Sequence, residues 1–125
     1  MTLIDTSSWI EQLRRGGDET VRERVEVLLV AGEAAWCPIV RLELWNGARG
    51  EREKTVLREM EAAIPTLEIL PAVWDEATAL ARLAREEGIT VPATDLVVAA
   101  CARYHGAAVE HNDAHFELLA TLKPA

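Results

Sequence analysis

Four acidic residues stand in this sequence at places where their side chains could act together. Asp5 ends a short apolar run, Glu43 lies within VRLELWNGA, Asp95 within PATDLVVAACA, and Asp113 within EHNDAHFE. Carboxylates that share one site repel one another, and their pKa values rise unless a positive charge neutralises them. A divalent cation can do this, and oxygen ligands suit Mg²⁺ or Mn²⁺. Taken together, the four acids predict a metal site.

Each acid also has a structural explanation, which the sequence leaves open. Asp113 could cap the last helix, the dipole of its helix could favour Asp95, and Asp5 could accept N–H groups of the turn that follows it. Glu43 lies in a locally apolar segment, where an unpaired carboxylate is costly to bury. An exposed helix face would also explain Glu43. Only the convergence of several acids at one place favours a metal.

The elements that must position these acids are short apolar strands alternating with helical stretches. Strands are predicted at residues 2–5, 34–39, 67–70 and 107–112. Helices are predicted at residues 7–15, 19–32, 40–48, 51–64, 73–87, 92–106 and 113–122. This alternation is typical of βαβ units, and it predicts a three-layer α/β/α domain with a short, mostly parallel sheet. The carboxyl ends of parallel strands share one edge, where ligands bind, so this fold would bring the acids together.

Local signals also predict how several helices begin and end. Ser8 with Glu11 has the spacing of a capping box for the first helix, which would stop at the glycine pair 16–17. Asp18 is expected to cap the second helix, and Thr94 the helix that carries Asp95.

Size and composition fit one domain with its own core. The chain has 125 residues, half of them hydrophobic. No apolar run reaches the roughly 18 residues of a membrane span, so we expect a cytoplasmic protein with no membrane partner. Cys37 and Cys101 lie in apolar stretches without metal-ligand spacing and are expected to be buried free thiols. The formal charge of −8 argues against a protein that binds nucleic acid by phosphate neutralisation alone.

The four acidic segments also resemble a known family. LIDTSSWI, VRLELWNGA, PATDLVVAACA and EHNDAHFE, in this order and at this chain length, resemble PIN-domain ribonucleases, and more narrowly the VapC-type toxins of bacterial toxin–antitoxin pairs. The resemblance covers essentially the whole chain and implies a single PIN domain over residues 1–125. It further implies an endoribonuclease that cuts a transfer RNA or a ribosomal RNA loop and so inhibits translation.

The resemblance assigns a role to each acid. Asp5, Glu43, Asp95 and Asp113 would form the catalytic pocket and hold one or two Mg²⁺ or Mn²⁺ ions, with Asp5 and Asp95 as the most dependable ligands. The carboxylates would mainly hold the metal, and Glu43 or Asp113 would be better placed than Asp5 to take a proton from the attacking water.

Four further residues are candidates for binding the substrate. Thr6 and Ser7 would place hydroxyls and N–H groups at a helix start, where a phosphate oxygen can be held. Arg41 and Arg49 flank the Glu43 segment and are candidates for contact with the RNA backbone.

One position departs from the family pattern. Family members often carry a second acid two residues after the one that matches Asp113, whereas this chain has His115 there. The change leaves open a tightly bound second metal, a polar role near the substrate, or a histidine that faces solvent.

Partners follow from the same resemblance. We expect a VapB-like antitoxin whose C-terminal segment covers the pocket, an RNA substrate, and a homodimer of the toxin. The alternative reading is a non-catalytic PIN-like interaction module that binds a partner protein without cutting RNA.

Overall fold

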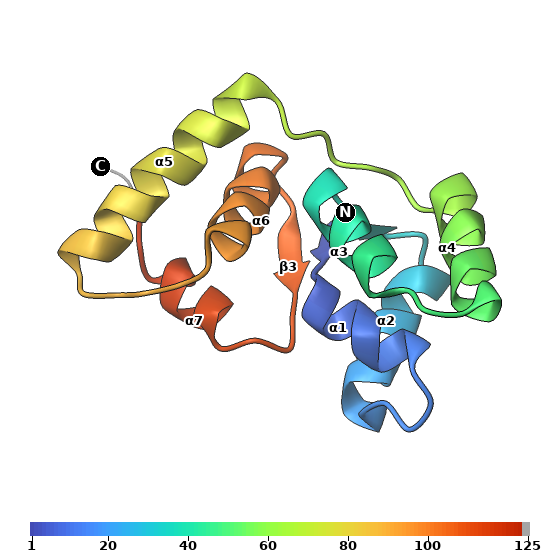
Figure 1. The fold of residues 1–125 in the computed structure, drawn as a ribbon. Coiled ribbons are helices and arrows are strands. Elements are labelled where there is room, and N and C mark those ends of the chain that lie inside the picture. The colour runs from blue at the N-terminus through green and yellow to red at the C-terminus, as the bar shows by residue number, and fades with distance from the viewer. Residues whose placement is uncertain (124–125) are drawn as a thin grey trace.

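The computed structural model describes residues 1–123, which form seven helices and a three-stranded sheet (Figure 1). In chain order the elements are β1 Thr2–Ile4, α1 Thr6–Leu13, α2 Glu19–Val30, β2 Ala34–Ala35, α3 Pro38–Gly47, α4 Glu51–Ala63, α5 Pro71–Glu86, α6 Ala93–Tyr104, β3 Ala108–Glu110 and α7 His115–Ala120. The predicted α/β class with a short parallel sheet is confirmed.

The sheet has β1 as its middle strand, in the order β2-β1-β3, and both pairings are parallel. Leu3 and Ile4 of β1 are fully buried, as expected of a strand covered on both faces. In Figure 1 the helices α5, α6 and α7 gather on one side of the sheet, and α1 to α4 gather on the other. Because all three strands run the same way, their carboxyl ends lie at one edge, where α1, α3 and the loop after β3 begin.

The prediction of a strand at residues 67–70 was wrong. That segment carries no ladder within the described part of the chain, and the only trace of pairing is an isolated parallel bridge between Trp36 and Thr66. The side chains of Leu67 and Ile69 are partly buried and pack against the core. Helix α5 begins directly afterwards, at Pro71. The apolar pattern of LEIL therefore indicated burial, which a strand and an extended connection have in common.

Two predicted helix starts were also wrong. Asp5, not Ser8, caps α1, and Ser8 and Glu11 lie inside the helix. Glu11 turns instead to the next connection, where its Oε1 accepts the main-chain N–H of Asp18 at 3.0 Å. The cap position of α6 is Pro92 rather than Thr94. Asp18 does cap α2, as predicted, by accepting the N–H of Val21.

The core is continuous through both helix layers. Trp9 and Trp36 are its largest fully buried side chains, whereas Trp74 is half exposed. Cys37 and Cys101 are buried and free, as predicted. Among the described residues, no helix is long and apolar enough to cross a membrane.

Candidate active site

Asp5 lies at the carboxyl end of β1 and is 4% exposed. Its Oδ2 accepts two hydrogen bonds from Ser7, one from the main-chain N–H at 3.0 Å and one from the hydroxyl at 2.7 Å. Asp5 therefore caps α1, and its carboxylate is held rigidly at the edge of the sheet. The capping explanation is correct, and it leaves the carboxylate at the sheet edge where a metal ligand is expected.

Glu43 comes from the middle of α3 and is half buried. The hydroxyl of Thr6 donates a hydrogen bond of 2.9 Å to its Oε1, which ties α3 to the start of α1. Burial raises the pKa of Glu43, the hydrogen bond from Thr6 opposes that rise, and the negative charges of Asp5 and Asp95 add to it. The side chain thus lies close enough to both aspartates to feel their charges.

Asp95 lies in the first turn of α6 and is 8% exposed. Burial raises its pKa, the hydrogen bond from His115 opposes the rise, and the charges of Asp113 and Asp5 increase it further. The charge of Asp5 thus acts on both Glu43 and Asp95, and that of Asp113 acts on Asp95, so the four acids lie within electrostatic range of one another. Three separate elements and one loop bring them together.

Asp113 lies in the loop between β3 and α7, where it is half buried. Its Oδ1 accepts the main-chain N–H of His115 at 2.9 Å, so it closes the turn into α7. The N-cap position itself is Ala114, whose methyl group cannot accept a hydrogen bond from the helix. Asp113 was predicted as the N-cap, and that prediction was wrong, because the N-cap lies one residue later. The second carboxylate oxygen of Asp113, Oδ2, forms no hydrogen bond among the described residues.

His115 joins two of the acids directly. Its Nδ1 lies 2.9 Å from Oδ2 of Asp95 and 3.0 Å from Oδ1 of Asp113. One ligand atom from each of these three residues lies within 4.8 Å of the others, which is the spacing of atoms around a single ion. The histidine therefore faces the acids, and the interpretation of a side chain that merely points to solvent was wrong.

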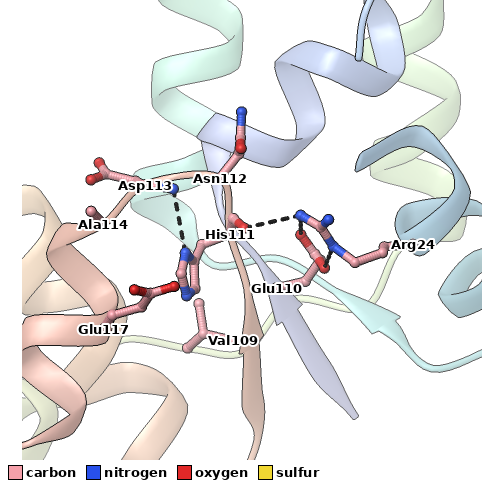
Figure 2. Close-up of a pocket in the computed structure, with 8 residues that line it drawn as sticks. All are labelled: Arg24, Val109, Glu110, His111, Asn112, Asp113, Ala114 and Glu117. Atoms are coloured by element: carbon pink, nitrogen blue, oxygen red, sulfur yellow. Dashed lines mark hydrogen bonds and ion pairs between the residues drawn. The ribbon is translucent and has the colours of Figure 1, made fainter. Parts of the chain in front are cut away.

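The loop that carries Asp113 also borders an open, mostly polar hollow of about 530 Å³ (Figure 2). Arg24 of α2, His111 and Asn112 of the loop and Glu117 of α7 line it. Figure 2 shows Asp113 on the loop between Asn112 and Ala114, and it is one of the residues that line the hollow.

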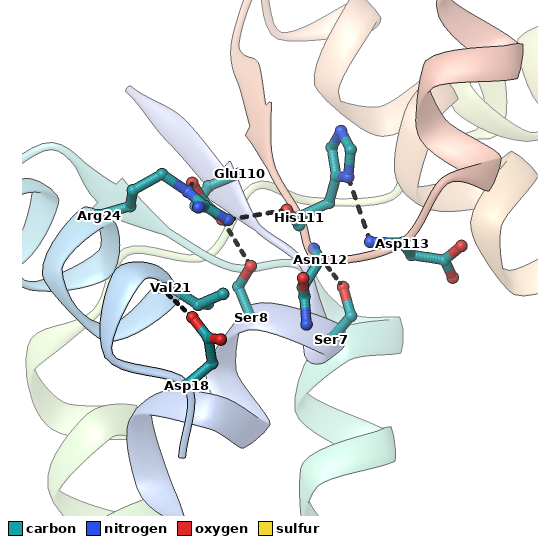
Figure 3. Close-up of polar contacts among 9 residues, drawn as sticks. All are labelled: Ser7, Ser8, Asp18, Val21, Arg24, Glu110, His111, Asn112 and Asp113. Atoms are coloured by element: carbon teal, nitrogen blue, oxygen red, sulfur yellow. Dashed lines mark hydrogen bonds and ion pairs between the residues drawn. The ribbon is translucent and has the colours of Figure 1, made fainter.

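A polar network that the sequence did not reveal holds this loop in place (Figure 3). The guanidinium of Arg24 binds Glu110 through Nε at 2.7 Å and through Nη2 at 3.3 Å, and it also donates to the main-chain oxygen of His111. Ser8 donates a hydrogen bond to the same Glu110 carboxylate. Since Glu110 ends β3 and Arg24 lies on α2, the network fixes the loop to the helix layer.

Ser7 connects this network to the acids. Its hydroxyl donates to Asp5 and accepts the main-chain N–H of Asn112 at 2.9 Å, next to Asp113. This oxygen atom thus ties the start of α1 to the loop after β3, beside the main-chain bond from the N–H of Asp5 to the oxygen of Glu110. The only sequence signal for these contacts is a run of three hydroxyl residues after Asp5, a run that also occurs in ordinary caps.

The four predicted substrate-binding residues do not share one environment. The hydroxyls of Thr6 and Ser7 are engaged by Glu43 and Asp5. Arg41 precedes Glu43 by two residues on α3, so the two side chains project about 200° apart around the helix. Arg49 is exposed beyond the end of α3. Contact of these four residues with a substrate stays a prediction.

Removing the Ser7 hydroxyl tests its bridging role. We expect Ser7→Ala to lower the free energy of unfolding by about 1–3 kcal/mol, because Asp5 loses a donor and the N–H of Asn112 loses its acceptor. Urea denaturation measures the change. Thr55→Ala is the matched control, since the exposed Thr55 hydroxyl bonds only within α4 among the described residues, where it donates to the main-chain oxygen of Glu51 and accepts from Arg58. Equal losses in the two variants would contradict the bridge.

Neutralising Glu43 should stabilise the protein when metal is withheld with a chelator. Because the folded-state pKa of Glu43 is raised, ionised Glu43 opposes folding at pH values above that pKa. We expect Glu43→Gln to raise the free energy of unfolding at pH 8 by roughly 0.5–2 kcal/mol. The gain should vanish as the pH falls below the ordinary carboxyl range, where Glu43 is protonated in both states.

Thermal unfolding from about pH 3, below the ordinary carboxyl range, to about pH 8 measures this dependence. Glu61→Gln, which alters an exposed carboxylate on α4, is the control and should change little at any pH. If the gain in stability of Glu43→Gln persists unchanged at low pH, neither the burial of the Glu43 charge nor its repulsion by Asp5 and Asp95 is the cause.

The donor set fits a divalent cation. The acids offer hard carboxylate oxygens from four parts of the chain, and hydroxyl and main-chain donors hold several of them in position. Burial raises the pKa values of Glu43 and Asp95, and no Lys or Arg is paired with any of the four acids among the described ion pairs. Asp5, Asp95 and Asp113 could hold such an ion, with Glu43 beside them.

Comparisons with known proteins agree with this geometry. A family model described as PIN domain matches residues 2–122. VapC ribonuclease Mb1587 of Mycobacterium bovis is 34% identical over 98% of this chain and 93% of its own length. The solved structure of DNA-bound VapBC from Salmonella typhimurium has a TM-score of 0.78 at 22% identity, covering 94% of this chain and 92% of that chain.

A second solved structure has the same fold. VapBC-5 of Mycobacterium tuberculosis, a member of the VapBC family of toxin–antitoxin systems, gives a TM-score of 0.68 at 22% identity, over 94% of this chain and 89% of that chain. These structures establish the architecture, and the family model and the identity to Mb1587 establish the relationship. The chain belongs to the PIN domain family and, within it, to the VapC ribonucleases.

Proposed function

We propose that this chain is the toxin of a toxin–antitoxin pair and a divalent-metal-dependent endoribonuclease that hydrolyses RNA in the cytoplasm and inhibits translation. The observation that carries the proposal is the gathering of Asp5, Glu43, Asp95 and Asp113 at one edge of the sheet in a member of the VapC family. All four are acids, and none is paired with a Lys or Arg among the described ion pairs.

In this proposal three of the acids bind the metal ion, and the fourth takes a proton from water. Asp5, Asp95 and Asp113 would hold the Mg²⁺ or Mn²⁺, which supplies a Lewis acid that stabilises charge on the phosphate and lowers the pKa of water. Glu43 is the acid suited to take the proton from the attacking water, because burial raises its pKa toward the working pH. Thr6 orients that carboxylate through its hydrogen bond.

The substrate proposed is single-stranded or looped RNA. The hollow beside Asp113 is open and polar, and it offers the imidazole of His111 and the amide of Asn112. Sequence-specific RNA recognition mostly targets unpaired bases that such side chains can contact. With a net charge of −8 the chain has little general attraction for duplex phosphates, which favours recognition of a particular RNA structure.

The partner proposed is a VapB-like antitoxin with a cationic segment. The acids would attract such a segment, and the VapBC fold similarity supports the pairing. We also propose a homodimer of the toxin, which rests on the family resemblance.

RNA cleavage by the purified chain, free of antitoxin, tests the proposed function. Total cellular RNA is incubated with Mg²⁺, with Mn²⁺ or with EDTA, beside Asp95→Asn as the inactive control. Discrete fragments that need metal and are absent from the variant support the proposal, and their ends identify the target. No cleavage by a folded chain under any metal would favour the interaction module that binds a partner without cutting RNA.

A further inference from the structure

His115 differs in kind from every other side chain at the acidic cluster. It stands where the family resemblance leads one to expect an acid, and its Nδ1 is in contact with carboxylate oxygens of both Asp95 and Asp113. The three ligand atoms lie within 4.8 Å of one another. The imidazole therefore occupies the cluster itself and does not cover it from outside.

The backbone fixes this placement. His115 is the first residue of α7, and its main-chain N–H donates to Oδ1 of Asp113 at 2.9 Å, so the turn that positions Asp113 positions His115 as well. Phe116, the next residue, is buried in the core and anchors the start of the helix. The hydrogen bond to Asp113 and the burial of Phe116 thus direct the ring at Asp95. Neither of them depends on the contact between His115 and Asp95.

An imidazole changes which ion such a cluster prefers. Mg²⁺ is bound through oxygen, and a site with only carboxylates suits it. Imidazole nitrogen suits first-row transition metals, and sites with mixed nitrogen and oxygen ligands bind them with rising affinity from Mn²⁺ onward. Replacing an expected carboxylate by histidine also removes one negative charge, which weakens the hold on a hard cation.

We propose that His115, as the neutral tautomer with its proton on Nε2, binds a metal through Nδ1 together with Asp95 and Asp113, in place of the Nδ1 hydrogen bond to Asp95, and that it makes this site select Mn²⁺ or another transition metal over Mg²⁺. The inference rests on the metal site of the proposed function but not on RNA cleavage. His115 would then act in the chemistry as a ligand and not as an acid or base.

Mn²⁺ binding to the full chain tests the proposal without any activity measurement. Electron paramagnetic resonance counts free Mn²⁺ during a titration, competition with Mg²⁺ gives the selectivity, and spin-echo modulation detects a coordinated ¹⁴N nucleus. The variants are His115→Asp, which restores an all-oxygen cluster, and His115→Gln. His105→Gln is the control, since that ring is exposed, bonds to the main-chain oxygen of Glu68, packs edge-on with Tyr104, and lies outside the acidic cluster.

We expect ¹⁴N modulation in the wild type and in the His105 variant, and none in either His115 variant. The preference for Mn²⁺ over Mg²⁺ should fall by at least about tenfold in His115→Asp. Wild type that binds Mn²⁺ without ¹⁴N modulation, or His115→Asp with unchanged selectivity, would overturn the inference even if RNA is cleaved. Nitrogen ligation without RNA cleavage would leave the inference standing and would refute the proposed nuclease.

Discussion

Replacing Asp5 with Asn leaves the chain folded and lowers metal-dependent RNA cleavage by at least about 100-fold, the upper range for a lost contact around a metal. Asn caps helices about as well as Asp, and its amide oxygen can accept the same bonds from Ser7. What it lacks is the negative charge that holds the cation. The substitution therefore separates the two roles that the sequence left open for this residue.

A second cap aspartate provides the matched control. Asp18 begins α2 in the same way, by accepting a main-chain N–H two to three residues ahead, but it is exposed and lies outside the acidic cluster. Asp18→Asn should therefore retain cleavage and should unfold at the same temperature as Asp5→Asn to within a few degrees. If Asp5→Asn still cleaves RNA at a wild-type rate, Asp5 is a cap only and the metal role is wrong.

Replacing Gly17 with Ala has the largest expected effect on stability. A Cβ at Gly17 would lie 1.8 Å from the main-chain oxygen of Glu11 and 2.7 Å from its carbonyl carbon. No rotamer change can relieve a clash with backbone, so the turn between α1 and α2 must open. That movement would also break the bond from Asp18 N–H to the Glu11 side chain.

We expect Gly17→Ala to lower the free energy of unfolding by roughly 3 kcal/mol, at the upper end of overpacking penalties. Gly16→Ala is the matched control. Gly16 has a φ of +68° but no atom within 4 Å of an added Cβ, so it should lose only about 1 kcal/mol from the left-handed backbone. Urea denaturation compares the two, and similar losses would show that the close approach of Gly17 to Glu11 is not decisive.

The arrangement of the acids was predictable because it depends on topology. A strand that ends in Asp5 and another that leads to Asp113 place those residues at one edge of any parallel sheet. Asp95 follows from the same rule, since α6 leads into β3. The pattern of short apolar runs and helices was enough to find this edge.

The contacts that hold the acids were not predictable, because they join residues that share no local pattern. Ser7 meets Asn112, and Arg24 meets Glu110, only after the whole chain has folded. Ser8 and Glu11 have the spacing of a capping box, but Asp5 already supplies the cap, so each found a partner elsewhere. Local spacing shows which residues can cap, and tertiary packing decides which one does.

The position of β1 between β2 and β3 also has a consequence for when the acidic cluster can form during synthesis. Synthesis runs from the N-terminus, so β1 and Asp5 emerge from the ribosome well before β3 and the loop with Asp113. Until β3 adds to β1, the strand that carries Asp5 has an unfilled edge and the acidic cluster is incomplete. A fragment that stops before β3 therefore lacks the complete cluster, and under the proposed function it should not cleave RNA.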